Sequence, residues 1–190
     1  MFIFRLRIGA ECKTVDIPFF LEFLGYDVHG EGESSYEYAR RKPEIVLKSM
    51  EEFTRERYGA DVLKVEIPIQ MAFVEGTRAF KGQKLHTLAE AMEITRSAAA
   101  LTNKPIVYLS AGVSSQTFVE TLELAAESGV KFHGVLGGRA TWQDGVPVYV
   151  KHGAAALEEW LNTTGIQNVK NINKALESAH PWYEAGSVQA

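Results

Sequence analysis

Short runs of mainly apolar residues divide the chain, and each is followed by a longer stretch in which apolar residues recur at helical spacing. The runs are residues 17–22, 61–66, 105–110 and 132–137. None of them alternates apolar with polar residues, as a half-exposed strand does. Continuous apolar character bounded by polar residues or glycine is typical of strands that are buried on both faces of a parallel sheet.

The stretches between and after these runs are predicted to be helical. They cover residues 36–58, 85–101, 117–128, 154–161 and 172–179. Pro43 is expected near a helix start or at a break between two helices, and Gly129 is expected to cap a helix that follows Ser114. Strand and helix alternate about four times, which is the signature of right-handed βαβ units and predicts the α/β class.

The length of the chain leaves two architectures open. A complete (β/α)8 barrel takes about 250 residues, and this chain has 190. It therefore supplies either a small open parallel sheet or half a barrel. In both cases we expect a single domain over residues 1–190.

Composition narrows the class of protein and its partners. Apolar residues make up 46% of the chain and charged residues 23%, which suits a folded core and argues against disorder. A net charge of −4 without a basic cluster argues against a nucleic-acid partner, and no apolar run approaches the length of a membrane span. Cys12 is the single cysteine, so a disulfide framework within one chain is excluded and we expect a cytoplasmic protein.

The first residues combine apolar and basic side chains. Residues 1–7 read MFIFRLR and are followed at once by Gly9, Ala10 and Glu11. A secretory signal needs a longer apolar stretch and a small-residue cleavage site. We interpret the segment as the end of a helix or strand that begins elsewhere, with a targeting segment as the alternative.

Lys64 and Glu22 are the strongest candidates for chemistry, because functional groups of parallel α/β folds collect at the carboxyl ends of strands. Lys64 stands between Leu63 and Val65 in a run that should be buried. Burial favours the neutral amine, which can attack a carbonyl and form a Schiff base. Glu22 ends the first run, where a carboxylate can act as a general acid or base. The structural alternatives are a lysine that reaches solvent or pairs with Glu66, and a strand-terminal salt bridge for Glu22.

Two glycine-containing loops follow the last two strands and are predicted to bind phosphate. Ser110 and Gly112 follow the third run, and Gly138 and Arg139 follow the fourth. Glycine lets the backbone approach an anion, and an arginine can donate two hydrogen bonds to a phosphate. The alternative is a pair of tight turns that need glycine. Trp142 is expected either to flank this site or to pack.

Other kinds of site are not indicated. The five histidines are scattered without the spacing of metal ligands, and neither a GxGxxG nor a P-loop pattern is present.

Ordered motifs make the chain resemble a known family. The segments DIPFFLE at 16–22, DVLKVE at 61–66, YLSAGVS at 108–114 and GVLGGRATW at 134–142 resemble class I tagatose-1,6-bisphosphate aldolases, and the likeness runs from about residue 8 to about residue 184. The resemblance implies a (β/α)8 TIM barrel, of which this chain would be a carboxyl-terminal half carrying strands five to eight. Strands one to four would be missing, with an acid on the first and a second lysine on the fourth.

The resemblance also implies a reaction and roles for individual residues. Lys64 would be the Schiff-base lysine and Glu22 the acid/base, while Ser110, Gly112, Gly138 and Arg139 would hold a substrate phosphate. The implied reaction is reversible cleavage of tagatose 1,6-bisphosphate to dihydroxyacetone phosphate and glyceraldehyde 3-phosphate, without metal or other cofactor.

Alternatives to this activity and its partners remain open. One is a relative that acts on sulfofructose phosphate as an aldolase or transaldolase, and the other is a catalytically inactive fragment with a binding role. We expect a sugar phosphate as ligand, and either self-association or pairing with the missing half.

Overall fold

The centre of the protein is a parallel sheet of four strands, arranged in the order β1-β2-β5-β6. The computed structural model describes residues 2–184, with side chains from residue 7 onward. The strands are β1 (Phe20–Glu22), β2 (Val62–Val65), β5 (Ile106–Leu109) and β6 (Val135–Leu136). Each prediction of a strand is confirmed, although each strand is shorter than the apolar run that predicted it. The α/β class is therefore correct.

Helices connect the strands as the alternating pattern predicts. The larger ones are α1 (Phe2–Thr14), α2 (Tyr36–Phe53), α3 (Leu88–Ala99), α4 (Ser115–Glu127), α6 (Gly145–Trp160) and α7 (Ile166–Ala175). Short elements are η1 (Glu56–Tyr58), η2 (Met71–Phe73), α5 (Arg139–Trp142), the π-helical turn η3 (Leu161–Gly165) and η4 (Trp182–Glu184). Residues 2–7 belong to α1, so of the two structures considered for this segment the helix is the one found; Met1 lies outside the described residues.

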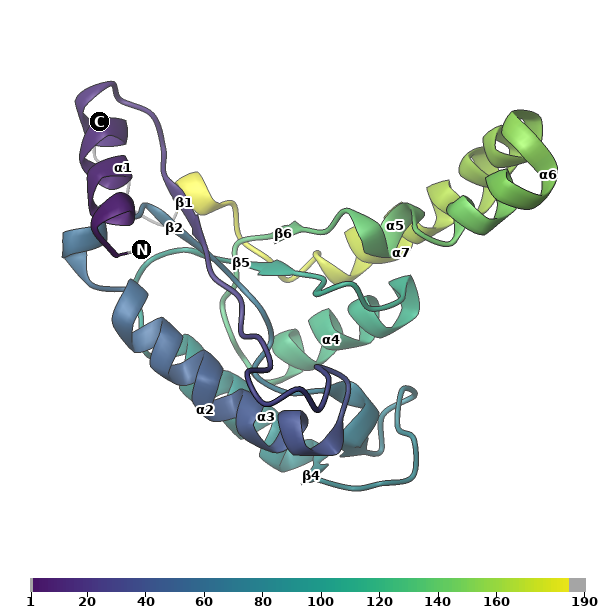
Figure 1. Ribbon diagram of the computed structural model, residues 1–190, viewed down its shortest axis with the longest axis horizontal. Coiled ribbons are helices and arrows are strands. Elements are labelled where there is room, and N and C mark those ends of the chain that lie inside the picture. Colours follow the sequence, from purple (N-terminus) through teal and green to yellow (C-terminus); the bar gives the residue numbers. More distant parts are fainter. Residues whose placement is uncertain (1, 185–190) are drawn as a thin grey trace.

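Alternate strand residues build the main core on one face of the sheet. Leu21, Leu63, Val65, Ile106 and Tyr108 belong to one buried cluster that also includes side chains of α2, α3 and α4. In Figure 1 these three helices lie along the same side of the sheet. The other alternate positions, among them those of Glu22 and Lys64, therefore face away from this helix layer.

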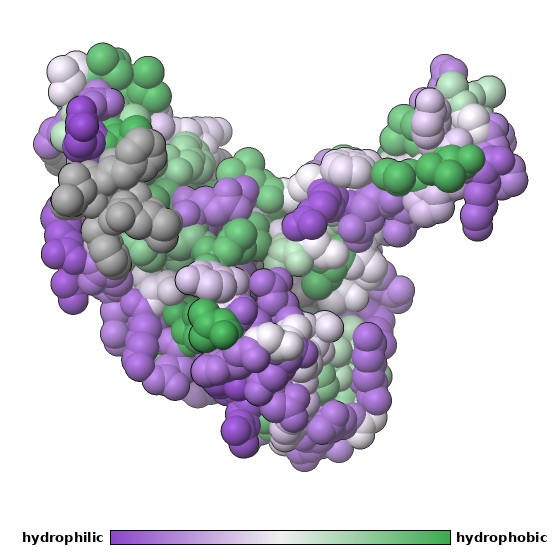
Figure 2. All heavy atoms as spheres, in the orientation of Figure 1, coloured by the Kyte–Doolittle hydropathy of each residue, from purple (hydrophilic) through white to green (hydrophobic). Residues whose placement is uncertain are grey.

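The opposite side of the sheet lies between two projecting parts of the molecule. Figure 1 shows α1 at one end and the α6–α7 arm at the other, and Figure 2 shows that the surface is hollowed between them. The arm also exposes large apolar and aromatic side chains: Val146, Tyr149, Val150, Leu161, Ile166 and Val169. Figure 2 shows green, hydrophobic spheres on this arm.

Pro43 does not mark a helix start or a break, so this prediction is wrong. It lies inside α2, which continues from Tyr36 to Phe53. An interior proline costs about 3 kcal/mol through a lost hydrogen bond and a steric clash. The helix persists because its inner face buries Ala39, Val46 and Met50 against the core.

Burial on both faces is true of the inner strands but not of the outer ones. Val62, Leu63 and Val65 of β2 are buried, whereas Leu136 of β6 is 48% exposed. A second small sheet, β3 (Val74–Glu75) with β4 (His86–Thr87), was not predicted because each strand has only two residues.

No helix within residues 2–184 is both long enough and apolar enough to cross a membrane.

Candidate active site

Lys64 and Glu22 meet at the carboxyl ends of neighbouring strands. The register pairs Glu22 of β1 with Lys64 of β2, so both side chains leave the same face of the sheet. The Nζ atom of Lys64 lies 2.9 Å from Oε2 of Glu22. The side chain of Lys64 is 20% exposed and that of Glu22 is 45% exposed, so a ligand in solvent can reach both groups.

The alternative partner of Lys64, Glu66, is excluded by the structure. Glu66 is buried and forms an ion pair with Lys42 of α2, with Nζ and Oε2 2.9 Å apart. Its other carboxylate oxygen accepts a hydrogen bond from the backbone N–H of Gly25 at 2.7 Å. Glu22 does form a salt bridge at the end of its strand, as the structural alternative predicts, and its partner is Lys64.

The loop after β5 has the backbone geometry of a tight turn that leaves room for an arginine. Ala111 and Gly112 both have positive φ, at 49° and 75°. Val113 donates its N–H to the carbonyl of the buried Ser110 at 3.1 Å. A Cβ atom at position 112 would lie only 3.2 Å from Cζ of Arg139. A side chain at position 112 would therefore strain the turn and require the guanidinium of Arg139 to shift.

The loop after β6 joins this turn from the next strand. Gly138 precedes the short helix α5, whose first residue is Arg139, and both residues are exposed. A hydrogen bond of 3.0 Å from Nε2 of Gln143 to the carbonyl of Val113 links the two loops directly. Trp142 lies beside Gly138, since a Cβ there would be 3.6 Å from Nε1 of its indole. Trp142 therefore flanks these loops and is 47% exposed.

The predicted site residues thus lie at the carboxyl ends of the strands or in the loops that follow them. Lys64 and Glu22 are in contact, and Gly112 and Arg139 are in contact. Because all four strands are parallel, the loops after β5 and β6 leave the same edge as the ends of β1 and β2. The carboxyl ends of these strands therefore carry an amine and a carboxylate, on β2 and β1, and a guanidinium in the loop after β6.

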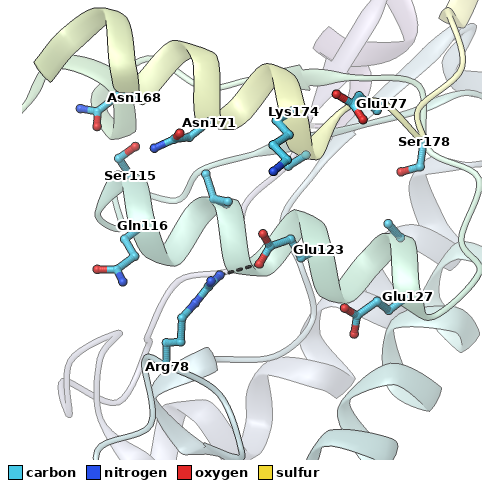
Figure 3. Close-up of a pocket in the computed structure, with 13 residues that line it drawn as sticks. Arg78, Ser115, Gln116, Glu123, Glu127, Asn168, Asn171, Lys174, Glu177 and Ser178 are labelled. Atoms are coloured by element: carbon cyan, nitrogen blue, oxygen red, sulfur yellow. Dashed lines mark hydrogen bonds and ion pairs between the residues drawn. The ribbon is translucent and has the colours of Figure 1, made fainter. Parts of the chain in front are cut away.

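A separate groove lies away from these residues. It has a volume of about 660 Å³ and runs between α4 and α7 (Figure 3), and none of the predicted site residues lines it. Charged side chains of both signs project into it, and Arg78 forms an ion pair there with Glu123 (Figure 3). This groove belongs to the helix layer and not to the ends of the strands.

No group of three or more His, Cys, Asp or Glu side chains within residues 2–184 is arranged to hold a metal ion.

Comparison with known proteins identifies the family. Residues 5–144, well over half of the chain, match the DeoC/LacD family of aldolases. The chain belongs to the DeoC/LacD aldolase family. The α/β architecture with its parallel sheet agrees with the TIM barrel of that family.

Curated relatives in the DeoC/LacD family point to one group of aldolases. The chain is 49% identical over 179 residues to tagatose 1,6-diphosphate aldolase 2 of Streptococcus pyogenes serotype M1, covering 94% of this chain and 54% of that protein. It is 47% identical over 177 residues to tagatose 1,6-diphosphate aldolase of Lactococcus lactis subsp. lactis, covering 93% and 54%. The aldolase of the same name from Listeria monocytogenes serotype 4a (strain HCC23) is 46% identical over 183 residues, covering 96% and 54%. The chain spans about half the length of the curated relatives that it matches.

Sequence reasoning missed the buried pair of Lys42 and Glu66 next to the site. Lys42 lies in a helix whose sequence, ARRKPE, looks like a solvated charged stretch. Its position is a helical turn from Tyr38 and Val46, both on the buried face of α2, and that spacing is the only signal that could have found it.

Proposed function

We propose that this DeoC/LacD protein acts, alone or as part of a larger assembly, as a Schiff-base aldolase that cleaves tagatose 1,6-bisphosphate reversibly into dihydroxyacetone phosphate and glyceraldehyde 3-phosphate. The observation that carries the proposal is the 2.9 Å contact between the amine of Lys64 and the carboxylate of Glu22 on paired strands. The family and the names of the relatives support the reaction class and the substrate.

The proposed reaction begins with Lys64. A proton leaves its ammonium group, and Glu22 at 2.9 Å is the nearest acceptor among the contacts of the described residues. The free amine attacks C2 of the ketose to form a carbinolamine. Glu22 gives the proton that it took from Lys64 to the hydroxyl of this carbinolamine, which leaves as water, so that an iminium remains on Lys64 and Glu22 is again a carboxylate. The iminium then serves as the electron sink for carbon–carbon cleavage, so this scheme requires no metal.

Glu22 then moves the proton that cleavage requires. As the carboxylate, it takes the proton of the C4 hydroxyl while the C3–C4 bond breaks, and the electron pair of that bond moves to the iminium to form an enamine. Glyceraldehyde 3-phosphate leaves with its new aldehyde. Glu22 returns the proton to C3, and one water hydrolyses the resulting iminium, which releases dihydroxyacetone phosphate and restores Lys64.

The loops after β5 and β6 are proposed to hold a phosphate of the substrate. Arg139 would donate paired hydrogen bonds through its guanidinium, next to the turn at Gly112. Ser110 and Gly138 would contribute the polar and backbone groups on either side. A fixed phosphate holds the ketose carbonyl at the reach of Lys64, and such positioning lowers the barrier of a bimolecular attack.

The outer strands suggest what completes the site. Within residues 2–184, neither β1 nor β6 has a partner on its outer side. Unpaired edges with adjacent apolar residues favour association. We propose that a second copy of the chain, or a polypeptide that supplies further strands, covers these edges.

Covalent trapping tests the central step. The 190-residue chain is incubated with dihydroxyacetone phosphate and borohydride, and the modified lysine is identified by mass spectrometry of peptides. We expect an adduct at Lys64 that is absent from the Lys64→Arg variant and strongly reduced by Arg139→Ala. A folded sample without the adduct, or with adducts spread evenly over exposed lysines such as Lys170, contradicts the proposed function.

A further inference from the structure

A buried carboxylate lies just beyond the site and ties together the segments that carry Lys64 and Glu22. Glu66 follows β2, two residues after Lys64. It is only 6% exposed, and both of its carboxylate oxygens have partners. Oε2 is 2.9 Å from the ammonium group of Lys42 on α2, and Oε1 accepts the N–H of Gly25 at 2.7 Å.

Gly25 belongs to the loop that leaves β1, three residues after Glu22. The ladder between β1 and β2 is weak at this point, because its last bond, from the N–H of Phe23 to the carbonyl of Lys64, is 3.4 Å long. Beyond that bond, the N–H of Gly25 donates to Glu66, and further along the side chain of Gln70 donates to the carbonyl of Glu33. Glu66 therefore holds the first part of the loop, next to the end of β1, whereas Asp27 and Glu31 further along the loop pair with Arg41 of α2.

The surroundings leave little freedom for this contact. A Cβ atom at position 25 would lie 2.8 Å from the hydroxyl of Tyr38, 2.9 Å from Cγ2 of Ile45 and 3.1 Å from Oε1 of Glu66. The loop backbone is thus pressed against α2 and against the carboxylate. Burial, together with the charge of Glu66, raises the pKa of Tyr38 to about 12, which keeps this hydroxyl neutral beside the pair.

An ion pair buried to this degree is a poor source of net stability, because desolvation of both charges offsets their attraction. What it supplies is a carboxylate held in one place. An exposed pair on the same helix, Lys48 with Glu44, lacks both the burial and the backbone contact.

We propose that Glu66 is a positioning residue, anchored by Lys42, that holds the loop after β1 through Gly25 and so keeps Glu22 against Lys64. The consequence for catalysis rests on the proposed function, but the positioning itself does not. If the loop is released, Glu22 moves from the amine, and the ammonium form of Lys64 loses its partner.

The test measures how Lys64 titrates, without any aldolase activity. The full chain is reductively methylated with formaldehyde and cyanoborohydride over a pH series, and labelling at Lys64 is normalised to the exposed Lys170. Only the free amine reacts, so loss of a carboxylate partner moves the pH midpoint of labelling downward. Glu22→Gln, which removes the carboxylate and keeps the size of the side chain, defines the full shift.

Matched variants separate positioning from general stability. Gly25→Ala adds a methyl group that pushes the loop away from Glu66, while the charges of Lys42 and Glu66 stay in place. The double variant Lys42→Met with Glu66→Leu removes the acceptor of the Gly25 N–H without leaving a buried charge unpaired. Both should move the midpoint most of the way towards that of Glu22→Gln. Lys42→Met with Glu66→Gln keeps an acceptor for Gly25 and should retain the wild-type midpoint, as should Glu44→Gln.

Two outcomes overturn the inference. One is a wild-type midpoint in the Gly25→Ala variant when circular dichroism shows that it is folded, and this variant decides alone if the Leu variant does not fold. The other is an equal shift in the Gln and Leu double variants. Absence of the dihydroxyacetone phosphate adduct, with these shifts present, would instead reject the proposed function alone.

Discussion

His133 illustrates how one residue can join two strands. Its backbone N–H donates to the carbonyl of Ile106 at 2.7 Å, and its Nδ1 accepts the N–H of Ile106 at 3.1 Å. The second bond requires a neutral imidazole with a free lone pair on Nδ1. Burial lowers the pKa of His133 below its usual value, and the nearby His180 lowers it further. Both histidines line a groove of about 570 Å³ together with four charged side chains: Arg96, Lys104, Lys131 and Glu184.

We therefore predict that His133 makes stability depend on pH. Because its folded pKa is below the unfolded value of about 6.5, its contribution is present above that value and is lost as the pH falls through the folded pKa. The free energy of unfolding of the wild-type chain should fall with acidification by up to about 1.4 kcal/mol per pH unit for this group. His133→Asn, which offers an acceptor that does not titrate, should have a smaller slope.

Urea unfolding between pH 5 and 8 measures both slopes, and the exposed His152→Asn provides the control. Burial also lowers the pKa of His86, but His86 is present in all three proteins and contributes equally to each slope. Equal slopes for the wild type and His133→Asn would show that His133 is not coupled to folding.

At the level of elements, caps and packing decide where helices begin and end. Ser114 was predicted to precede a helix, and its Oγ accepts the N–H of Thr117 at the start of α4. Gly129 follows the end of this helix with φ at 76°, as predicted. Local rules of this kind act over a few residues, so they are readable from sequence.

The start of α3 offers a test of such a cap. Thr87 accepts the N–H of Glu90 at 3.3 Å, and the Glu90 carboxylate accepts the N–H of Thr87 at 2.7 Å, which completes a reciprocal capping box. Thr87→Ala should lower the free energy of unfolding by about 0.5–2 kcal/mol. Ser97→Ala, at an exposed position of the same helix, should change it by less than about 0.5 kcal/mol. Denaturant midpoints distinguish the two, and equal losses would contradict the role of the cap.

The whole molecule is an open parallel sheet with an unpaired strand at each edge of the part that the structure describes, residues 2–184. Parallel sheets are normally covered on both faces or closed into barrels. A two-fold rotation could place β6 of one copy beside β1 of another with every strand parallel, and eight strands suffice to close a barrel.

We expect the isolated chain to self-associate through these edges. Size-exclusion chromatography with light scattering over a concentration series should give a dimer or a larger species. Leu136→Lys on β6 should shift the equilibrium towards monomer, because it places a charge on an edge strand. Leu88→Lys, on the outer helix layer, is the matched control. A monomer at all concentrations, or equal effects of the two variants, would contradict this expectation.

The sequence by itself determined the order of helices and strands, and it placed the candidate site residues at the carboxyl ends of the strands. Apolar runs followed by helical stretches are local patterns, so they predicted the parallel sheet, and the place of Lys64 and Glu22 near their strand ends followed. The motif after β5 and the motif after β6 indicated the loops that the structure links through Gln143 and Val113.

Only the tertiary structure decided which charged groups meet. The sequence offered Glu66 as a partner for Lys64 because the two are neighbours along the chain, yet strand register gave Lys64 to Glu22. Glu66 instead reaches Lys42, which is 24 positions earlier, and this pairing depends on how α2 packs on the sheet. Packing likewise overrode the local penalty of Pro43. Contacts between residues far apart in sequence depend on register and packing, which no local spacing records.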